Sequence, residues 1–217
     1  MGAIQDSAGE GRTACACEHE GQPSRMVVLT GGPGAGKTAV LNLVRQRLCR
    51  HVYVVEEAAS ILFGGGFPRE TDDQAQRSAQ RAIYHVQSEL ERIALDRRRT
   101  VLAVCDRGTL DGIAYWPGEG ERYLGELGTT IEAELARYAR VIHLRTPPAS
   151  QYNHDNHLRV ETAMEAGRID ERIWRVWERH PRRTTIESHD DFLRKAEQAL
   201  ELIEDELLSV CPRCSRD

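Results

Sequence analysis

The most informative stretch of the chain is a glycine-rich octapeptide, Gly31-Gly32-Pro33-Gly34-Ala35-Gly36-Lys37-Thr38, which has the pattern G-x-x-x-x-G-K-T. An apolar run, residues 26–29, comes directly before it, and a helix-like stretch, residues 39–44, comes directly after it. A strand that leads through such a loop into a helix brings backbone N–H groups together around phosphate oxygens. The octapeptide therefore predicts a phosphate-binding loop, or P-loop, in an α/β domain.

Each residue type in the loop has a physical reason. Glycine permits positive φ and a close approach to an anion, and the helix N-terminus adds positive potential. A lysine at position 37 reaches the β- and γ-phosphates, and the Thr38 hydroxyl is a ligand for Mg²⁺. Lys37 and Lys195 are the two lysines of the chain, whereas arginine supplies the other 27 of the 29 basic residues. We expect residues 31–39, from Gly31 to Ala39, to hold ATP or GTP with Mg²⁺. A simple connecting turn is the alternative, and the flanking strand and helix argue against it.

The length and net charge of the chain limit its domain number and the kinds of partner it can have. A chain of 217 residues suits one α/β domain with insertions. Its net charge of −5 argues against a nucleic-acid partner, because nucleic-acid modules carry basic faces. No apolar run approaches the roughly 20 residues that span a bilayer, and the N-terminus has no apolar signal core. We therefore expect a cytoplasmic protein without integral membrane association, and its oligomeric state stays open.

Apolar runs alternate with helical patterns along the chain. Residues 1–23 are small and polar and are expected to form a mobile leader. We expect the nucleotide-binding domain to span residues 24–209 and a cysteine-containing tail to follow at residues 210–217. Strand-like runs occur at residues 26–30, 51–55, 100–105, 140–144 and 184–187. This alternation predicts βαβ crossovers, and so a five-stranded parallel sheet with helices on both faces in a three-layer α/β fold.

The two longest helical patterns have apolar stripes that we interpret as core. One spans about residues 71–97 and the other ends the domain. The stripe residues recur every three or four positions; they are Ala75, Ala79, Ala82, Ile83, Val86, Leu90 and Ile93 in the first helix and Phe192, Ala196, Ala199, Leu200, Ile203 and Leu207 in the last.

Charged residues follow the predicted strands. In open α/β sheets ligands bind beyond the carboxyl ends of the strands. Asp106 follows the third run and is a candidate Mg²⁺ carboxylate, with a helix-capping role as the alternative. Arg107 is placed to touch the transferring phosphoryl group or an acidic substrate, and ordinary ion pairing is its alternative. Glu56 and Glu57 end the second run, and one of them is a candidate general base; neighbouring strand residues point to opposite faces, so both are not expected in the site.

Two further regions are candidates for ligand contact. The glycine-rich stretch at residues 62–68 is open to ordering by a substrate. Residues 146–181 are rich in arginine and resemble a kinase lid, with Arg159 and Arg168 as phosphate contacts. An exposed helix laced by ion pairs is the equal alternative. Tyr115, Tyr152 and Asn153 are candidates to stack on or hydrogen-bond a ring, although packing is the commoner role of such aromatics.

The six cysteines fall into two groups. Cys49 and Cys105 lie in apolar segments and are expected to be buried. Cys15 and Cys17 near one end, with Cys211 and Cys214 near the other, have spacings that a zinc or disulfide clasp could use if the termini meet. Unpaired tail cysteines are the simpler interpretation.

Taken together, these motifs resemble one family. The pattern is similar to the P-loop domain group shared by nicotinamide-riboside kinase domains of the NadR type and TRPL-translocation-defect trafficking proteins, over roughly residues 24–206. It is carried by residues 31–38, 54–59 and 106–112, Tyr152-Asn153, Arg159 with Glu161, and 180–182. The resemblance implies a kinase-like sheet of order 2-3-1-4-5, ATP or GTP with Mg²⁺, and a substrate pocket between the second-strand glutamate, the Asp106-Arg107 turn and the lid. It also brings Asp111 to the substrate side.

The site residues favour one function and leave another open. A donor cradle, a metal carboxylate, a candidate base and an arginine-rich lid predict transfer of the γ-phosphoryl group to a small hydroxyl-bearing metabolite. The alternative is a nucleotide-gated regulatory module or ATPase with a protein or lipid partner. A motor ATPase is disfavoured, because Arg107 rather than a glutamate follows Asp106.

Overall fold

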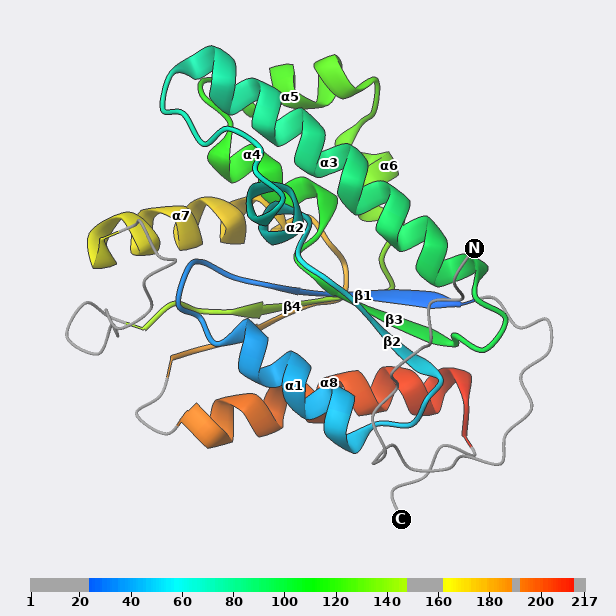
Figure 1. Ribbon diagram of the computed structural model, residues 1–217. Coiled ribbons are helices and arrows are strands. Elements are labelled where there is room, and N and C mark those ends of the chain that lie inside the picture. Colours follow the sequence, from blue (N-terminus) through cyan, green and yellow to red (C-terminus); the bar gives the residue numbers. More distant parts are fainter. Residues whose placement is uncertain (1–23, 148–161, 189–191, 213–217) are drawn as a thin grey trace.

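The computed structural model describes residues 24–147, 162–188 and 192–212. Its sheet has five parallel strands: β1 (Arg25–Thr30), β2 (Val52–Val55), β3 (Leu102–Asp106), β4 (Arg140–Leu144) and β5 (Arg183–Ile186). Their order is β2-β3-β1-β4-β5, with β1 in the centre (Figure 1). The predicted sheet and its order are confirmed, and all five strands begin and end within two residues of the predicted runs.

Helices cover both faces of the sheet, as expected (Figure 1). One layer contains α1 (Lys37–Arg47) and α8 (Phe192–Val210), which pack with Leu29, Val54 and Ile142 in one apolar core. The other layer has its own core, which includes Val28, Cys105 and Trp177. The helices of that second layer are α2 (Ala58–Gly64), α3 (Asp73–Asp96), the short 3₁₀ helix η1 (Thr109–Asp111), α4 (Gly112–Tyr115), α5 (Gly120–Leu127), α6 (Ile131–Leu135) and α7 (Ala163–Val176).

The apolar stripe of α8 is buried at Ala196, Ala199, Leu200, Ile203 and Leu207, but Phe192 at its start is 42 % exposed. The apolar stripe of α3, which we interpreted as core, is only partly buried. Ile93 is 49 % exposed, whereas the polar residues Gln87 and Glu91 are buried. The inner face of α3 packs against other polar groups. Hydrogen bonds as well as apolar spacing therefore determine which side of α3 faces the rest of the protein.

The predicted lid region contributes one described helix, α7, whose start is set by local hydrogen bonds. Thr162 accepts from the backbone N–H of Glu165, and the Glu165 carboxylate accepts from the backbone N–H of Thr162. This reciprocal capping satisfies two N–H groups that a helix start otherwise leaves without partners. None of the helices that the structure describes is long and apolar enough to cross a membrane.

Candidate nucleotide and substrate site

The octapeptide leads from β1 into the first turn of α1, so the predicted sequence of strand, glycine-rich loop and helix is present. Gly34 and Gly36 have φ values of 78° and 96°, which favour glycine. Gly31 has φ 136°, and a Cβ atom there would lie 2.1 Å from the carbonyl oxygen of Leu144. The Lys37 Nζ atom donates to the carbonyl oxygens of Gly31 and Gly32 at 3.0 and 3.1 Å. The amine is therefore held over the loop.

Asp106 and Thr38 have the chemistry of a Mg²⁺ site. Asp106 ends β3 and is 9 % exposed, and its Oδ1 atom is buried with no hydrogen-bond partner among the described residues. Burial raises the pKa of this carboxyl to about 6, although the charge of Lys37 opposes the shift. Thr38 lies in the first turn of α1 and is exposed. An orphaned carboxylate oxygen and the hydroxyl of an exposed threonine fit a hard cation that prefers oxygen ligands.

Arg107 sits at the centre of the site. It has φ 72°, a left-handed conformation that non-glycine residues adopt at a cost and often at functional positions. Its Nε atom donates to Glu57 Oε1 at 2.6 Å, and its NH1 atom donates to the carbonyl oxygen of Gly31 at 3.1 Å and to Asp111 Oδ2 at 3.3 Å. The guanidinium also lies 5.7 Å from the centre of the Tyr115 ring. One side chain thus joins the P-loop, the start of α2 and the η1 turn.

The two adjacent glutamates after β2 point to different places. Glu57 pairs with Arg107 and lines a cleft, whereas Glu56 is mostly exposed and its Oε1 atom lies 2.5 Å from NH2 of Arg45. Burial opposes ionisation of Glu57, but the charges of Arg107 and Lys37 and a hydrogen bond from Ser60 lower its pKa to about 2. The geometry therefore favours Glu57 over Glu56 for any role at a reacting hydroxyl.

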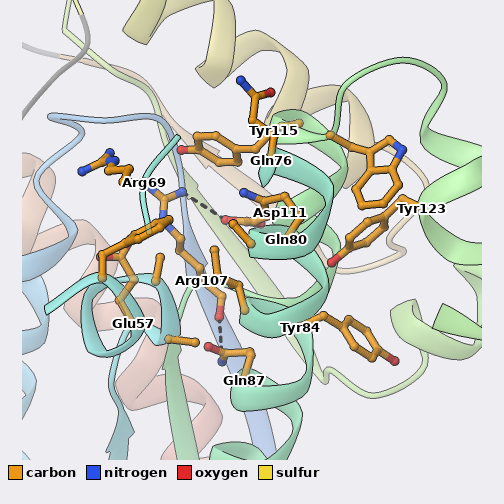
Figure 2. Close-up of a pocket in the computed structure, with 18 of the residues that line it drawn as sticks. Glu57, Arg69, Gln76, Gln80, Tyr84, Gln87, Arg107, Asp111, Tyr115 and Tyr123 are labelled. Carbon is orange, nitrogen blue, oxygen red and sulfur yellow. Dashed lines mark hydrogen bonds and ion pairs between the residues drawn. The ribbon is translucent and has the colours of Figure 1, made fainter. Parts of the chain in front are cut away.

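A cleft of about 1030 Å³ opens beside these residues. Glu57, Arg107 and Asp111 line it close to one another, and Gln76, Gln80 and Gln87 line it from α3 (Figure 2). P-loop residue Pro33 also lines it, so the cleft adjoins the predicted phosphate site. Such a volume is at the upper end for small-molecule pockets. Its aromatic lining residues are Phe63, Phe67, Tyr84, Tyr115, Trp116 and Tyr123.

Sequence reasoning missed the polar face of α3. Gln87 Nε2 donates to Glu91 Oε1 at 2.9 Å and to the carbonyl oxygen of Arg107 at 3.3 Å. The buried Glu91 also accepts from the Tyr138 hydroxyl at 2.9 Å, and Arg137 pairs with its other oxygen. This network holds the carbonyl of the left-handed residue in place. Its signal in the sequence was the interruption of an apolar stripe by glutamine and glutamate at helical spacing.

A second buried group, also unforeseen, joins α7 to the P-loop. The backbone N–H of Gly32 donates to Asp170 Oδ1 at 2.8 Å. His143 Nε2 lies 3.0 Å from the same oxygen, and Arg145 NH1 lies 3.2 Å from Asp170 Oδ2. Because a carboxylate only accepts, His143 carries its proton on Nε2 in this contact. Burial raises the pKa of Asp170, but the hydrogen bonds from His143 and Gly32 and the charge of Arg145 lower it below the ordinary value.

The remaining predicted site residues are placed as follows. Asp111 is 3 % exposed and accepts from Thr30 Oγ1 at 2.6 Å and from Trp177 Nε1 at 2.7 Å, so both its oxygens have protein partners at the base of the cleft. Tyr115 lines the cleft, whereas Arg168 is exposed on α7 and is not among the residues that line the cleft. Three further candidates, Tyr152, Asn153 and Arg159, lie outside the described residues.

The cysteine clasp stays a prediction. Cys49, Cys105 and Cys211 are buried, and Cys15, Cys17 and Cys214 lie outside the described residues. Within the part of the chain that the structure describes, no cluster of three or more His, Cys, Asp or Glu residues is arranged to hold a metal.

Comparison with known proteins assigns the chain to a family. Residues 26–195 match the family described as AAA domain, and the chain belongs to that family. No curated protein is similar enough in sequence to count as a match. The fold is that of P-loop kinases, as the similar solved structures show.

Two similar structures are of NadR. The NadR protein in complex with NR has a TM-score of 0.64 at 16 % identity, over 84 % of this chain and 51 % of that one. NadR in complex with NAD and AMP-PNP has a TM-score of 0.58 at 14 % identity, over 84 % and 49 %. The chain thus spans about half the length of NadR. Thymidylate kinase from Candida albicans has a TM-score of 0.60 at 12 % identity, over 85 % of this chain and 93 % of that one.

Proposed function

We propose that this protein is a P-loop kinase that transfers the γ-phosphoryl group of ATP or GTP to a hydroxyl of a small metabolite bound in the cleft. The observation that carries the proposal is the Glu57–Arg107 pair, which lines the cleft and contacts the P-loop through Gly31. The similarity to thymidylate kinase and to NadR supports a phosphoryl-transfer fold, and the NadR structures include complexes with AMP-PNP and with NR.

In this mechanism the P-loop amides and Lys37 hold the donor phosphates, and Thr38 and Asp106 would hold Mg²⁺. The metal ion would neutralise charge on the phosphate oxygens. Arg107 is positioned to stabilise charge on the transferring group, because its guanidinium lies between the P-loop carbonyl of Gly31 and the cleft.

Glu57 orients the attacking hydroxyl. A carboxylate with a pKa of about 2 is ionised throughout the physiological range, so it accepts a hydrogen bond from the hydroxyl at every working pH. Such a group is a weak Brønsted base, but the transition state of phosphoryl transfer is loose and requires little proton removal before attack. Positioning is therefore its main contribution.

The test is a screen of hydroxyl-bearing metabolites for acceptor-dependent formation of ADP or GDP, followed by paired variants. Glu57→Gln should lower kcat at least about 100-fold for an accepted metabolite, with nucleotide affinity unchanged. Glu56→Gln, one residue away on the outer surface, should retain near wild-type kcat. Tight nucleotide binding with no acceptor in a broad screen would count against kinase activity, and equal losses in both variants would remove Glu57 from the mechanism.

A further inference from the structure

The contact between α7 and the P-loop has no role in the mechanism above, although it is among the most buried polar contacts of the described chain. Asp170 and His143 are 2 % and 0 % exposed, and a peptide N–H of the P-loop donates to the Asp170 carboxylate. The Gly32 amide is thus committed to a side chain rather than to a phosphate. A nest of amides for the anion is left to the later residues of the loop.

Gly32 is also tightly packed against its neighbours. A Cβ atom at this position would lie 2.7 Å from Cβ of Asp170, 3.0 Å from the carbonyl oxygen of Ala166 and 2.4 Å from Oγ1 of Thr146. The Thr146 hydroxyl also donates to the carbonyl oxygen of Pro33 at 3.2 Å. The first half of the P-loop therefore has little freedom to move unless α7 moves with it.

The charge of Asp170 is compatible with an anion site nearby. His143 donates to it, and Arg145 pairs with its second oxygen, so its negative charge is offset within hydrogen-bond distance. Neighbouring residues of the same helix face elsewhere: Ile169 and Arg172 line the cleft. One helix thus contacts the P-loop through Asp170 and Ala166, and it lines the cleft through Ile169 and Arg172.

We infer that Asp170 is a positioning residue that couples the P-loop to α7, so that a nucleotide bound at the loop orders the helix that walls the cleft. Fixing the loop on a phosphate tail removes the freedom of its first residues, and the Gly32–Asp170 hydrogen bond passes that restraint to α7. The coupling is reciprocal: a molecule that fixes the cleft wall tightens nucleotide binding by the same factor. The inference rests on nucleotide binding at the P-loop but not on phosphoryl transfer.

The test is amide hydrogen exchange of the full chain with and without Mg·ADP, combined with calorimetric titration of Mg·ADP. In the wild type, Mg·ADP should slow exchange of the α7 amides about tenfold. Asp170→Ala should keep nucleotide affinity within about threefold, because the phosphate-binding amides and Lys37 remain, but lose the slowing in α7. Asp170→Asn should recover at least half of it, since its amide oxygen still accepts from Gly32.

Glu171→Ala is the matched control. Glu171 is the adjacent acid on the same helix and shares Arg145 with Asp170, but it pairs outward with Arg175. It should show the wild-type response. Bound Mg·ADP with unchanged α7 exchange in the wild type would overturn the coupling, and this measurement needs no variant. So would a full response in Asp170→Ala, or an Asn variant as unresponsive as the Ala variant. A flat titration of the wild type would instead overturn nucleotide binding itself.

Discussion

Arg107 and Glu57, fifty residues apart in the chain, form an ion pair of 2.6 Å at the carboxyl ends of neighbouring strands. The pair is partly buried, with 15 % and 26 % of the two side chains exposed. Each partner fixes the other: Arg107 keeps Glu57 ionised, and Glu57 directs the guanidinium toward the cleft. The pair therefore places one positive and one negative group together in the cleft beside the P-loop.

Arg107→Lys should therefore impair chemistry more than binding. Lysine keeps the charge but cannot reach Glu57, Gly31 and Asp111 together, because it lacks the planar fork of arginine. We expect kcat to fall about 100-fold with little change in the Kd for nucleotide. Steady-state kinetics and calorimetry would measure the two effects. Arg45→Lys, at the exposed pair with Glu56, is the control and should change neither; comparable losses in both variants would argue for a general charge effect.

Nucleotide binding should take up a proton near pH 8. Burial, followed by the charge of Arg107, lowers the pKa of Lys37 to about 8. Because the folded pKa lies below the unfolded value, stability of the nucleotide-free protein rises with pH between about 8 and 10.5 as far as Lys37 is concerned. A triphosphate favours the charged amine, so affinity should fall as pH rises through 8. Calorimetry in buffers of different ionisation enthalpy measures the proton uptake.

Lys195 is the necessary control for that experiment, because burial also lowers its pKa to about 8. Its Nζ atom donates to the carbonyl oxygens of Ala35 and Arg145, on the side of the loop formed by α8. Lys195→Met should retain the proton uptake, whereas Lys37→Ala should abolish nucleotide-induced thermal stabilisation. If Lys195→Met lost the proton uptake, the titrating group would be Lys195 rather than Lys37, and the prediction would be wrong.

The architecture was predictable because its signals are local. Five apolar runs separated by helical patterns define a parallel sheet, and the octapeptide fixes which strand leads into the first helix. The strand order came from the family resemblance, and the sheet of the structure has that order. Local patterns suffice here because burial on both faces makes each strand a short continuous apolar run.

The site was less predictable because the directions and partners of its side chains depend on tertiary geometry. Glu56 and Glu57 are chemically identical, and the chain leaves the strand before both of them, so alternation along a strand does not assign their directions. Asp170 contacts Gly32 across 138 residues, and nothing in the composition of α7 marks that aspartate among its acidic neighbours. The polar face of α3 was missed because alanines and isoleucines recur at helical spacing in the same helix, and their pattern indicated an apolar core.

Asp106→Asn should make the nucleotide-free protein more stable and the nucleotide complex weaker. Burial raises the Asp106 pKa to about 6, above its unfolded value, so its ionisation costs stability as pH rises from about 4 to 6. Above pH 7 the asparagine variant should gain on the order of 2 kcal/mol in free energy of unfolding, and the gain should shrink at pH 5. Urea titrations at the two pH values measure this.

The same variant should lose Mg²⁺-dependent nucleotide affinity about tenfold or more, because an amide oxygen is a poorer ligand for the ion than a carboxylate. Titration of ADP with Mg²⁺ and with EDTA separates the metal contribution. An asparagine variant with lower stability at every pH and undiminished dependence on Mg²⁺ would contradict the assignment.

Gly31→Ala should be far more damaging than Gly66→Ala, although both positions have positive φ, 136° and 91°. At Gly31 the new methyl group would meet the Leu144 carbonyl oxygen at 2.1 Å, and a backbone atom in the central part of the sheet cannot move away cheaply. At Gly66 no atom lies within 4 Å of the new Cβ, so only conformational strain is added. We expect a loss of about 1 kcal/mol at Gly66 and at least about 3 kcal/mol at Gly31, measured by urea unfolding. Equal losses in free energy of unfolding would mean that the positive φ alone explains the glycine at position 31. The close approach of β4 to the P-loop would then contribute nothing to the difference.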